Sequence, residues 1–205
     1  AIHFVATADI ADLSIYGIGV ANNGNGTDGE EYNFDSTDSA TAGDNILVVR
    51  SVEAMNAYMD ASTIFDQVIL GSSIISQNGN DAIELYLNGT VVEVFGNPEV
   101  NPDTNGAGCG DDVNCWDYED SWAYKIDGTW TYGGVNCTDG SSTTWDSFCI
   151  YPFAAAYAQT ITDVTFTVNT SNIEVGANGM YLGGGIFGSA NAHAMTDNDE
   201  DGTWE

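Results

Sequence analysis

Basic side chains are nearly absent from this chain. Arg50 and Lys125 are the only Lys or Arg residues among 205, against 31 Asp and Glu, and the formal net charge is −29. Proteins that bind nucleic acid neutralise phosphates with Lys and Arg, so nucleic acid is excluded as a partner. Long apolar runs are also missing. Since a membrane helix needs about 20 consecutive apolar residues, no membrane span is expected.

Catalytic side chains are scarce as well. His3 and His193 are the only histidines, and neither accompanies a Ser elbow of the G-x-S-x-G kind. The run Gly183–Gly185 has no Lys and no helix start after it, so it is not a nucleotide loop. Pairs of carboxylates occur, but 31 acids place such pairs everywhere by chance. We therefore expect no enzyme activity, no catalytic residue and no cofactor-binding residue.

Four cysteines are present, and they lie in Gly-, Asn-, Asp- and Ser-rich segments: Cys109, Cys115, Cys137 and Cys149. Their spacing lacks the paired C-x2-C knuckles of zinc sites. An even number in loop segments favours two local disulfides, Cys109 with Cys115 and Cys137 with Cys149. Such bridges imply an oxidising compartment, which predicts an extracellular or cell-surface protein.

The clearest structural signal is the stretch 78–96, which predicts a β-hairpin. Asn88-Gly89 supplies the positive φ angles of a two-residue type I′ turn, and the residues on either side alternate or are β-branched. Asp81 and Glu84 fall in an otherwise apolar arm. Each must therefore find a hydrogen-bond donor, a cation or water.

The hairpin residues 80–96 resemble the central hairpin of lamin-tail-like domains in secreted bacterial proteins. Further matching segments follow the order of that family: 12–24, 27–32, 121–125 and 132–140. The resemblance covers residues 1–150. It implies an immunoglobulin-like β-sandwich without catalytic residues, used as one module of a large exported protein.

The resemblance leaves two functions open. The first is a structural or adhesion module of a secreted or cell-surface bacterial protein. The alternative is an accessory, substrate- or surface-binding domain of an exported nuclease or other hydrolase. The first strand of the family is missing and no signal peptide is visible, so we expect a processed form or a piece of a longer chain. Neighbouring domains or a partner strand would then complete the sandwich.

The remaining pattern predicts an all-β protein with one short helix and a second, partial module. Apolar spacing after Ser51 predicts a helix that ends near Met59. Residues 151–159 contain no acid and are interpreted as a linker. Residues 160–205 resemble the opening half of a starch-binding-like or early-set immunoglobulin-like module, and are predicted to be an incomplete β-sandwich.

Two acidic segments are candidate calcium sites. Asp197, Asp199 and Asp201 occupy alternate positions before Gly202, as in the first half of a calcium loop. Asp111 and Asp112 form the second candidate. A solvated acidic turn is the alternative in both cases, and calcium is the only cofactor that the sequence suggests.

Two further hypotheses concern surface contacts. Several Trp residues lie beside Gly and Asp, where they could bind carbohydrate or pack in the core: Trp116, Trp130, Trp145 and Trp204. Cell-surface proteins are the other external partners considered. With so many acids available, we expect Arg50 or Lys125 to pair with a strand carboxylate such as Glu84 or Glu93.

Overall fold

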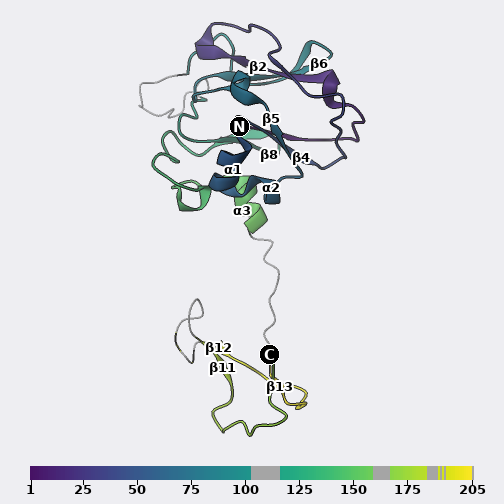
Figure 1. The fold of residues 1–205 in the computed structure, drawn as a ribbon. Coiled ribbons are helices and arrows are strands. Elements are labelled where there is room, and N and C mark those ends of the chain that lie inside the picture. The colour runs from purple at the N-terminus through teal and green to yellow at the C-terminus, as the bar shows by residue number, and fades with distance from the viewer. Residues whose placement is uncertain (103–115, 159–166, 184–188, 190, 192, 205) are drawn as a thin grey trace. The chain divides into compact units, whose positions relative to one another are not determined.

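The computed structural model of this protein describes residues 1–102, 116–158, 167–183, 189, 191 and 193–204. The chain divides into two compact units, Ala1–Gln159 and Thr160–Glu205. Figure 1 shows their elements.

Short strands dominate the first unit. Its strands are β1 (Ile2–Val5), β2 (Tyr16–Ala21), β3 (Tyr32–Asn33), β4 (Asn45–Val49), β5 (Gln67–Leu70), β6 (Ala82–Leu87), β7 (Thr90–Phe95), β8 (Ala123–Ile126) and β9 (Thr129–Tyr132). Its helices are α1 (Val52–Met59), α2 (Ala61–Ile64) and α3 (Pro152–Ala158), with 3₁₀ turns η1 (Leu13–Ile15), η2 (Asn22–Gly24), η3 (Ser72–Ile75) and η4 (Thr144–Asp146).

The strands form two main sheets. The antiparallel four-stranded sheet has the order β3-β2-β6-β7, and the three-stranded sheet has the order β1-β4-β5. Strands β4 and β5 run parallel, and helices α1 and α2 lie between them in the chain. The hairpin β8-β9 is a separate pair.

Strand β4 is buried on both faces and separates the two main parts of the core. Ile46 and Val48 pack in one cluster with Ile18 of β2, which joins the two sheets. Leu47 and Val49 pack in a second cluster with residues of α1, α2 and α3. Successive side chains of a strand point to opposite faces, so one short apolar strand serves both clusters. Figure 1 shows the resulting layers, with the β2-β6 sheet, the β4-β5 sheet and the helices in succession.

Helix α1 confirms the predicted short helix. Ser51 is its N-cap, and the Ser51 hydroxyl accepts a hydrogen bond from the Ala54 N–H at 3.2 Å. The predicted linker is different in the structure, because residues Pro152–Ala158 form α3. Phe153 and Ala154 pack in the second cluster, and Ala154 is fully buried. The apolar residues at the start of this segment therefore pack on the first unit, with Ala154 at the centre of the contact.

The β-hairpin predicted for residues 78–96 forms as expected, and we call it the organising hairpin. Strands β6 and β7 pair antiparallel and are joined by a turn at Asn88 and Gly89, whose φ angles are +50° and +74°. The face of β6 that carries Glu84 and Tyr86 is the more deeply buried one. Residues 27–31 come close to that face of the sheet. A Cβ at Gly19 of β2 would lie 2.5 Å from the Gly29 carbonyl oxygen, so glycine is required there.

The second unit contains two short antiparallel pairs among its described residues. Strand β10 (Val168–Asn169) pairs with β13 (Thr203–Trp204), and β11 (Tyr181–Leu182) pairs with β12 (His193–Ala194). Among the described residues of the second unit, Met195 and Thr170 are buried. Together with the sheets of the first unit, these pairs confirm the all-β prediction.

Asp81 joins three segments of the first unit at the start of β6. Its side chain is 2% exposed, and its two oxygens accept hydrogen bonds from the Asn23 N–H at 3.0 Å and the Asn78 N–H at 2.9 Å. The Tyr118 hydroxyl donates to the Asp81 carbonyl oxygen at 2.9 Å. The buried carboxylate is therefore satisfied by backbone donors, as its burial demands.

We predict that Asp81→Asn destabilises the protein. The amide offers one acceptor where two backbone N–H groups need one each, so one buried donor loses its partner. An unsatisfied buried group costs about 1–3 kcal/mol, and more where the lost acceptor was charged. Urea denaturation measures the change.

Asp127→Asn is the matched control for Asp81→Asn. Asp127 is exposed at the β8-β9 turn with φ of +49°, a conformation that Asn tolerates well. A surface exchange of this kind should change stability by less than about 0.5 kcal/mol. Equal stabilities of the two variants would contradict a structural role for the Asp81 carboxylate.

Candidate functional site

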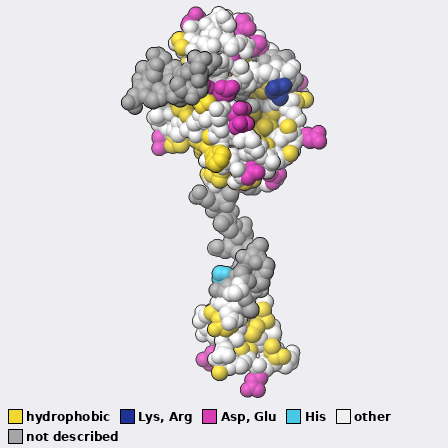
Figure 2. Space-filling view, turned by 90° about the vertical axis from the view of Figure 1, so that its left-hand side faces the viewer, with side chains coloured by type: hydrophobic (Ala, Val, Ile, Leu, Met, Phe, Trp, Pro, Cys, Tyr) yellow, Lys and Arg dark blue, Asp and Glu magenta, His cyan; other side chains and the backbone are white. Residues whose placement is uncertain are grey.

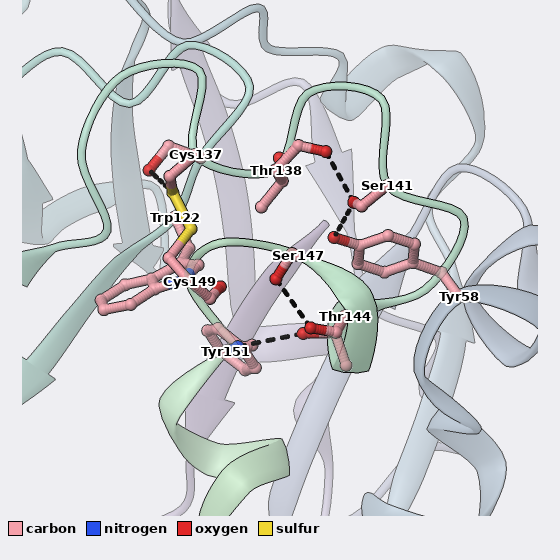
Figure 3. The surroundings of a disulfide bond; sticks show 10 residues. Tyr58, Trp122, Cys137, Thr138, Ser141, Thr144, Ser147, Cys149 and Tyr151 are labelled. Atoms are coloured by element: carbon pink, nitrogen blue, oxygen red, sulfur yellow. Dashed lines mark hydrogen bonds between the residues drawn. A yellow bond between two sulfur atoms is a disulfide. The ribbon is translucent and has the colours of Figure 1, made fainter.

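One predicted disulfide is present among the described residues. Cys137 and Cys149 are bonded, with their Cα atoms 5.6 Å apart, and close the loop 137–149 (Figure 3). The Trp122 indole N–H donates to the Cys149 carbonyl oxygen at 2.9 Å, which connects the bridge to the segment before β8. Cys109 and Cys115 lie outside the described residues.

Thr144 is the internal anchor of the disulfide loop. It is 1% exposed, and its hydroxyl accepts from the Tyr151 N–H at 3.0 Å while its carbonyl accepts from the Ser147 hydroxyl at 2.7 Å. Thr143 and Asp146 form a capping box around η4. Figure 3 shows the bonds of Thr144 to Tyr151 and Ser147 beside the bridge. The loop is therefore held by hydrogen bonds along its length as well as by the covalent bond.

The same loop exposes aromatic side chains. Phe148, next to Cys149, is 95% exposed, and Trp145 is 41% exposed. Because hydrogen bonds and the disulfide fix the backbone on both sides, these rings are presented on an ordered segment. Trp145 is therefore accessible to a ligand, as a Trp that binds carbohydrate has to be.

Two other candidate contact aromatics belong to the core. Trp116 is 5% exposed, and its ring centroid lies 5.8 Å from that of Phe95 in an edge arrangement. Trp130 lies 4.6 Å from Phe95 in the same way. Packing around Phe95 therefore accounts for both residues, and the sequence could not reveal it because Phe95 lies 21 and 35 positions away.

The acidic character of the chain is visible at the surface. Figure 2 shows Asp and Glu side chains scattered over one face of the first unit, with Lys or Arg at one place. Lys125 forms an ion pair with Glu93, as predicted, and its ammonium lies 5.4 Å from the centroid of the Trp130 ring. The paired side chains are 42% and 49% exposed, so solvent screens the pair and its contribution to stability is small.

The structure brings the predicted Asp197 loop together. One carboxylate oxygen from each of Asp197, Asp199 and Asp201 lies within 4.8 Å of the others. Asp197 also accepts from the Asp201 and Gly202 N–H groups, each at 3.1 Å, so this carboxylate shapes the turn. Asp111 and Asp112 lie outside the described residues.

Three oxygens at this spacing are compatible with calcium, so calcium binding at the Asp197 loop stays a prediction. We expect millimolar calcium to raise the melting temperature of the second unit above that in sodium chloride of matched ionic strength. The Asp199→Asn exchange should remove the difference, because Asp199 makes no turn-shaping bond among the described residues and its loss spares the fold. Equal shifts in both salts would leave only generic screening.

His3 of β1 connects this strand to the start of β4 and to the residue before α3. Its ring nitrogens are bonded to the Tyr151 hydroxyl at 2.9 Å and the Asn45 side-chain oxygen at 3.1 Å. Asn45 Oδ1 can only accept, so Nε2 carries the proton and Nδ1 accepts from Tyr151. Burial lowers the pKa of His3 below its ordinary value of 6.5, and the Asn45 bond opposes this shift. The ring acts as a structural link in its neutral form.

We predict that this link weakens the fold in mild acid. Because the folded-state pKa is the lower one, the unfolded chain binds a proton first as pH falls below 6.5, and the stability that the neutral ring supplies is lost towards the folded-state pKa. Urea denaturation between pH 7.5 and 5.5 should show a decrease that His3→Gln makes smaller; the buried Ala1 amino group, whose pKa is lowered to about 6, contributes to the same decrease. The control is His193→Gln in the second unit. An unchanged slope in His3→Gln would assign the pH dependence to other groups.

The candidate functional features of the described residues are therefore carboxylate hydrogen-bond acceptors, exposed aromatic side chains and a loop closed by a disulfide. The two histidines lie in different units, and His3 is engaged with Tyr151 and Asn45. No described helix has the length and apolar content needed to span a membrane. Comparison with protein-family models, curated proteins and solved structures found no match to this chain.

Proposed function

We propose that this chain is a non-catalytic extracellular module, with a structural or adhesive role in a larger secreted or cell-surface bacterial protein. The observation that carries the proposal is the Cys137–Cys149 bridge. Disulfides persist in oxidising environments such as the periplasm and the cell surface, and are rare in the cytosol. The lamin-tail-like identity of residues 1–150 is part of the same proposal.

The position of the bridge supports a mechanical role. It joins the two ends of a loop whose following segment leads into α3, and α3 packs against the β4-β5 sheet. Cross-linking a loop of this length removes conformational freedom from the unfolded chain and stabilises the fold by roughly 3 kcal/mol. Such reinforcement suits a domain that functions outside the cell, where it is not protected from unfolding by chaperones.

The net charge of −29 supports the same setting. A surface with excess charge of one sign stays soluble and resists non-specific association. The exposed rings of Phe148 and Trp145 provide an aromatic contact surface on this acidic background. In this proposal they contact a cell-surface protein or a carbohydrate.

The location is tested on the natural full-length protein. An antibody against this chain should detect it in the culture medium or at the protease-accessible cell surface. Peptide mapping of that material without reduction should recover Cys137 linked to Cys149. Cytosolic protein with both thiols reduced would contradict an extracellular role.

The adhesive role is tested with Phe148→Ser in the full chain. Because Phe148 is 95% exposed, its replacement should leave the melting temperature unchanged. Binding to cell-surface protein or to polysaccharide should fall at least about tenfold if the ring is a contact anchor. Val92→Ser on β7, where the side chain is 52% exposed, is the matched control. Equal binding by both variants would leave the module with a structural role alone.

A further inference from the structure

An open groove lies on the first unit along the chain segment that connects β1 to β2. Its volume is about 430 Å³, which is within the range of ligand sites in proteins. Its lining combines apolar side chains with two carboxylates: Ile10, Ile15, Tyr16, two alanines, Asp9 and Asp12. None of these residues belongs to the disulfide loop or to the Asp197 loop.

Hydrogen bonds from other parts of the first unit hold the backbone of the groove. Ile10 and Ala40 exchange backbone hydrogen bonds of 2.7 and 2.8 Å. The Ile15 carbonyl oxygen accepts from the Asn88 N–H at 2.7 Å, at the turn of the organising hairpin. The groove therefore has its shape before a partner arrives, and binding does not have to order it.

The two carboxylates of the groove are fixed by backbone donors. Asp9 accepts from the Ala42 N–H at 3.0 Å, and Asp12 accepts from the Ser14 N–H at 2.9 Å as the N-cap of η1. Hydrogen bonds from Ser14 hold the pKa of Asp12 below its ordinary value, although the charge of Asp35 opposes this shift. Asp9 and Asp12 are exposed, and each bond uses one oxygen, so both groups can also accept from a donor outside the chain.

The same groove presents apolar surface to solvent. Ile15 is 40% exposed. Ile10 and Tyr16 are partly buried, because one part of each side chain packs against the core cluster that contains Leu13 and Ile18. Another part of each side chain lines the groove. A partner that covers these side chains gains the free energy of burying apolar surface.

The shape of the groove favours a protein partner over a small molecule. Small ligands are bound in sites that bury about 70–90% of their surface. Most of the residues that line this groove are exposed, so one side of a small ligand would remain in solvent. A side chain of a partner protein does not have this disadvantage, because the partner itself covers the outer side.

The charge of the partner follows from the composition of the chain. The groove carries two carboxylates, and neither Arg50 nor Lys125 lines it. These two are the only Lys or Arg residues of the sequence, so the chain has no other Lys or Arg to place there. A second copy with a net charge of −29 would be repelled. Complementary charge therefore favours a different protein that carries Lys or Arg.

We propose that the groove at residues 8–16 is a docking site for a basic segment of a partner protein, in which Lys or Arg adjoins apolar side chains. The apolar side chains and the aliphatic stem of the basic residue cover Ile10, Ile15 and Tyr16. The cationic group of the same residue binds the carboxylate of Asp9 or Asp12. This site is separate from the exposed rings of the disulfide loop and does not depend on their adhesive role.

The test measures the binding of two fluorescein-labelled hexapeptides to the full chain by fluorescence anisotropy. One peptide consists of Leu and Lys, and the other has Ser in place of Leu, so both carry the same charge. The Leu-Lys peptide should bind at least about tenfold more tightly, because Leu adds apolar contact that Ser lacks. Its effects on the backbone amide NMR signals should be concentrated in residues 8–16. Equal affinities, or effects spread over the acidic surface, would mean non-specific attraction and overturn the proposal.

Two variants with matched controls locate the site. Asp12→Asn removes a charge but keeps the N-cap, since Asn and Asp cap equally well, and should weaken binding of the Leu-Lys peptide at least about threefold. Asp127→Asn, outside the groove, should leave it unchanged. Ile15→Ser should weaken binding at least about fivefold, whereas Ile126→Ser should not, although the two side chains are 40% and 44% exposed. If the groove variants bind as tightly as their controls, the groove is not the docking site.

Discussion

The pairing of the buried Asp81 carboxylate with two backbone N–H groups is the constraint on which the first unit depends. One donor, Asn23, belongs to the turn after β2, and the other, Asn78, precedes β6. Since β2 and β6 are neighbours in the four-stranded sheet, the carboxylate fixes the ends of the two central strands at once. The same residue receives Tyr118 through its carbonyl oxygen, so the segment before β8 is positioned by it as well.

The same solution recurs at other acids of this protein. Glu84 is 3% exposed and accepts hydrogen bonds from the Thr27 hydroxyl at 2.6 Å and the Tyr86 hydroxyl at 3.2 Å. Glu31 accepts from the Val20 N–H at 2.9 Å. Hydroxyl and backbone donors thus do the work that Lys and Arg do in most proteins, which explains how a chain with two basic residues can bury carboxylates.

Local chemistry made part of this architecture predictable. The Asn88-Gly89 turn and the Ser51 cap each depend on neighbours in sequence, and each formed as expected. The Cys137–Cys149 pair and the Asp197 cluster were also accessible, because their members are separated by few residues.

The features that were not predicted depend on contacts between residues that are far apart in the sequence. The segment 151–159 was interpreted as a linker because it contains no acid, whereas the Phe153 ring centroid lies 4.9 Å from those of both Phe65 and His3, which are far away in the sequence. The groove at residues 8–16 depends on the pairing of Ile10 with Ala40, a contact across 30 positions.

The outer edge of β7 has no hydrogen-bonded neighbour among the described strands, and Val91, Val92 and Val94 are exposed there. An exposed strand edge can pair with the same edge of another molecule and cause aggregation. Because these molecules are strongly negative, they repel one another, and this repulsion opposes aggregation. High salt or acid would weaken the repulsion.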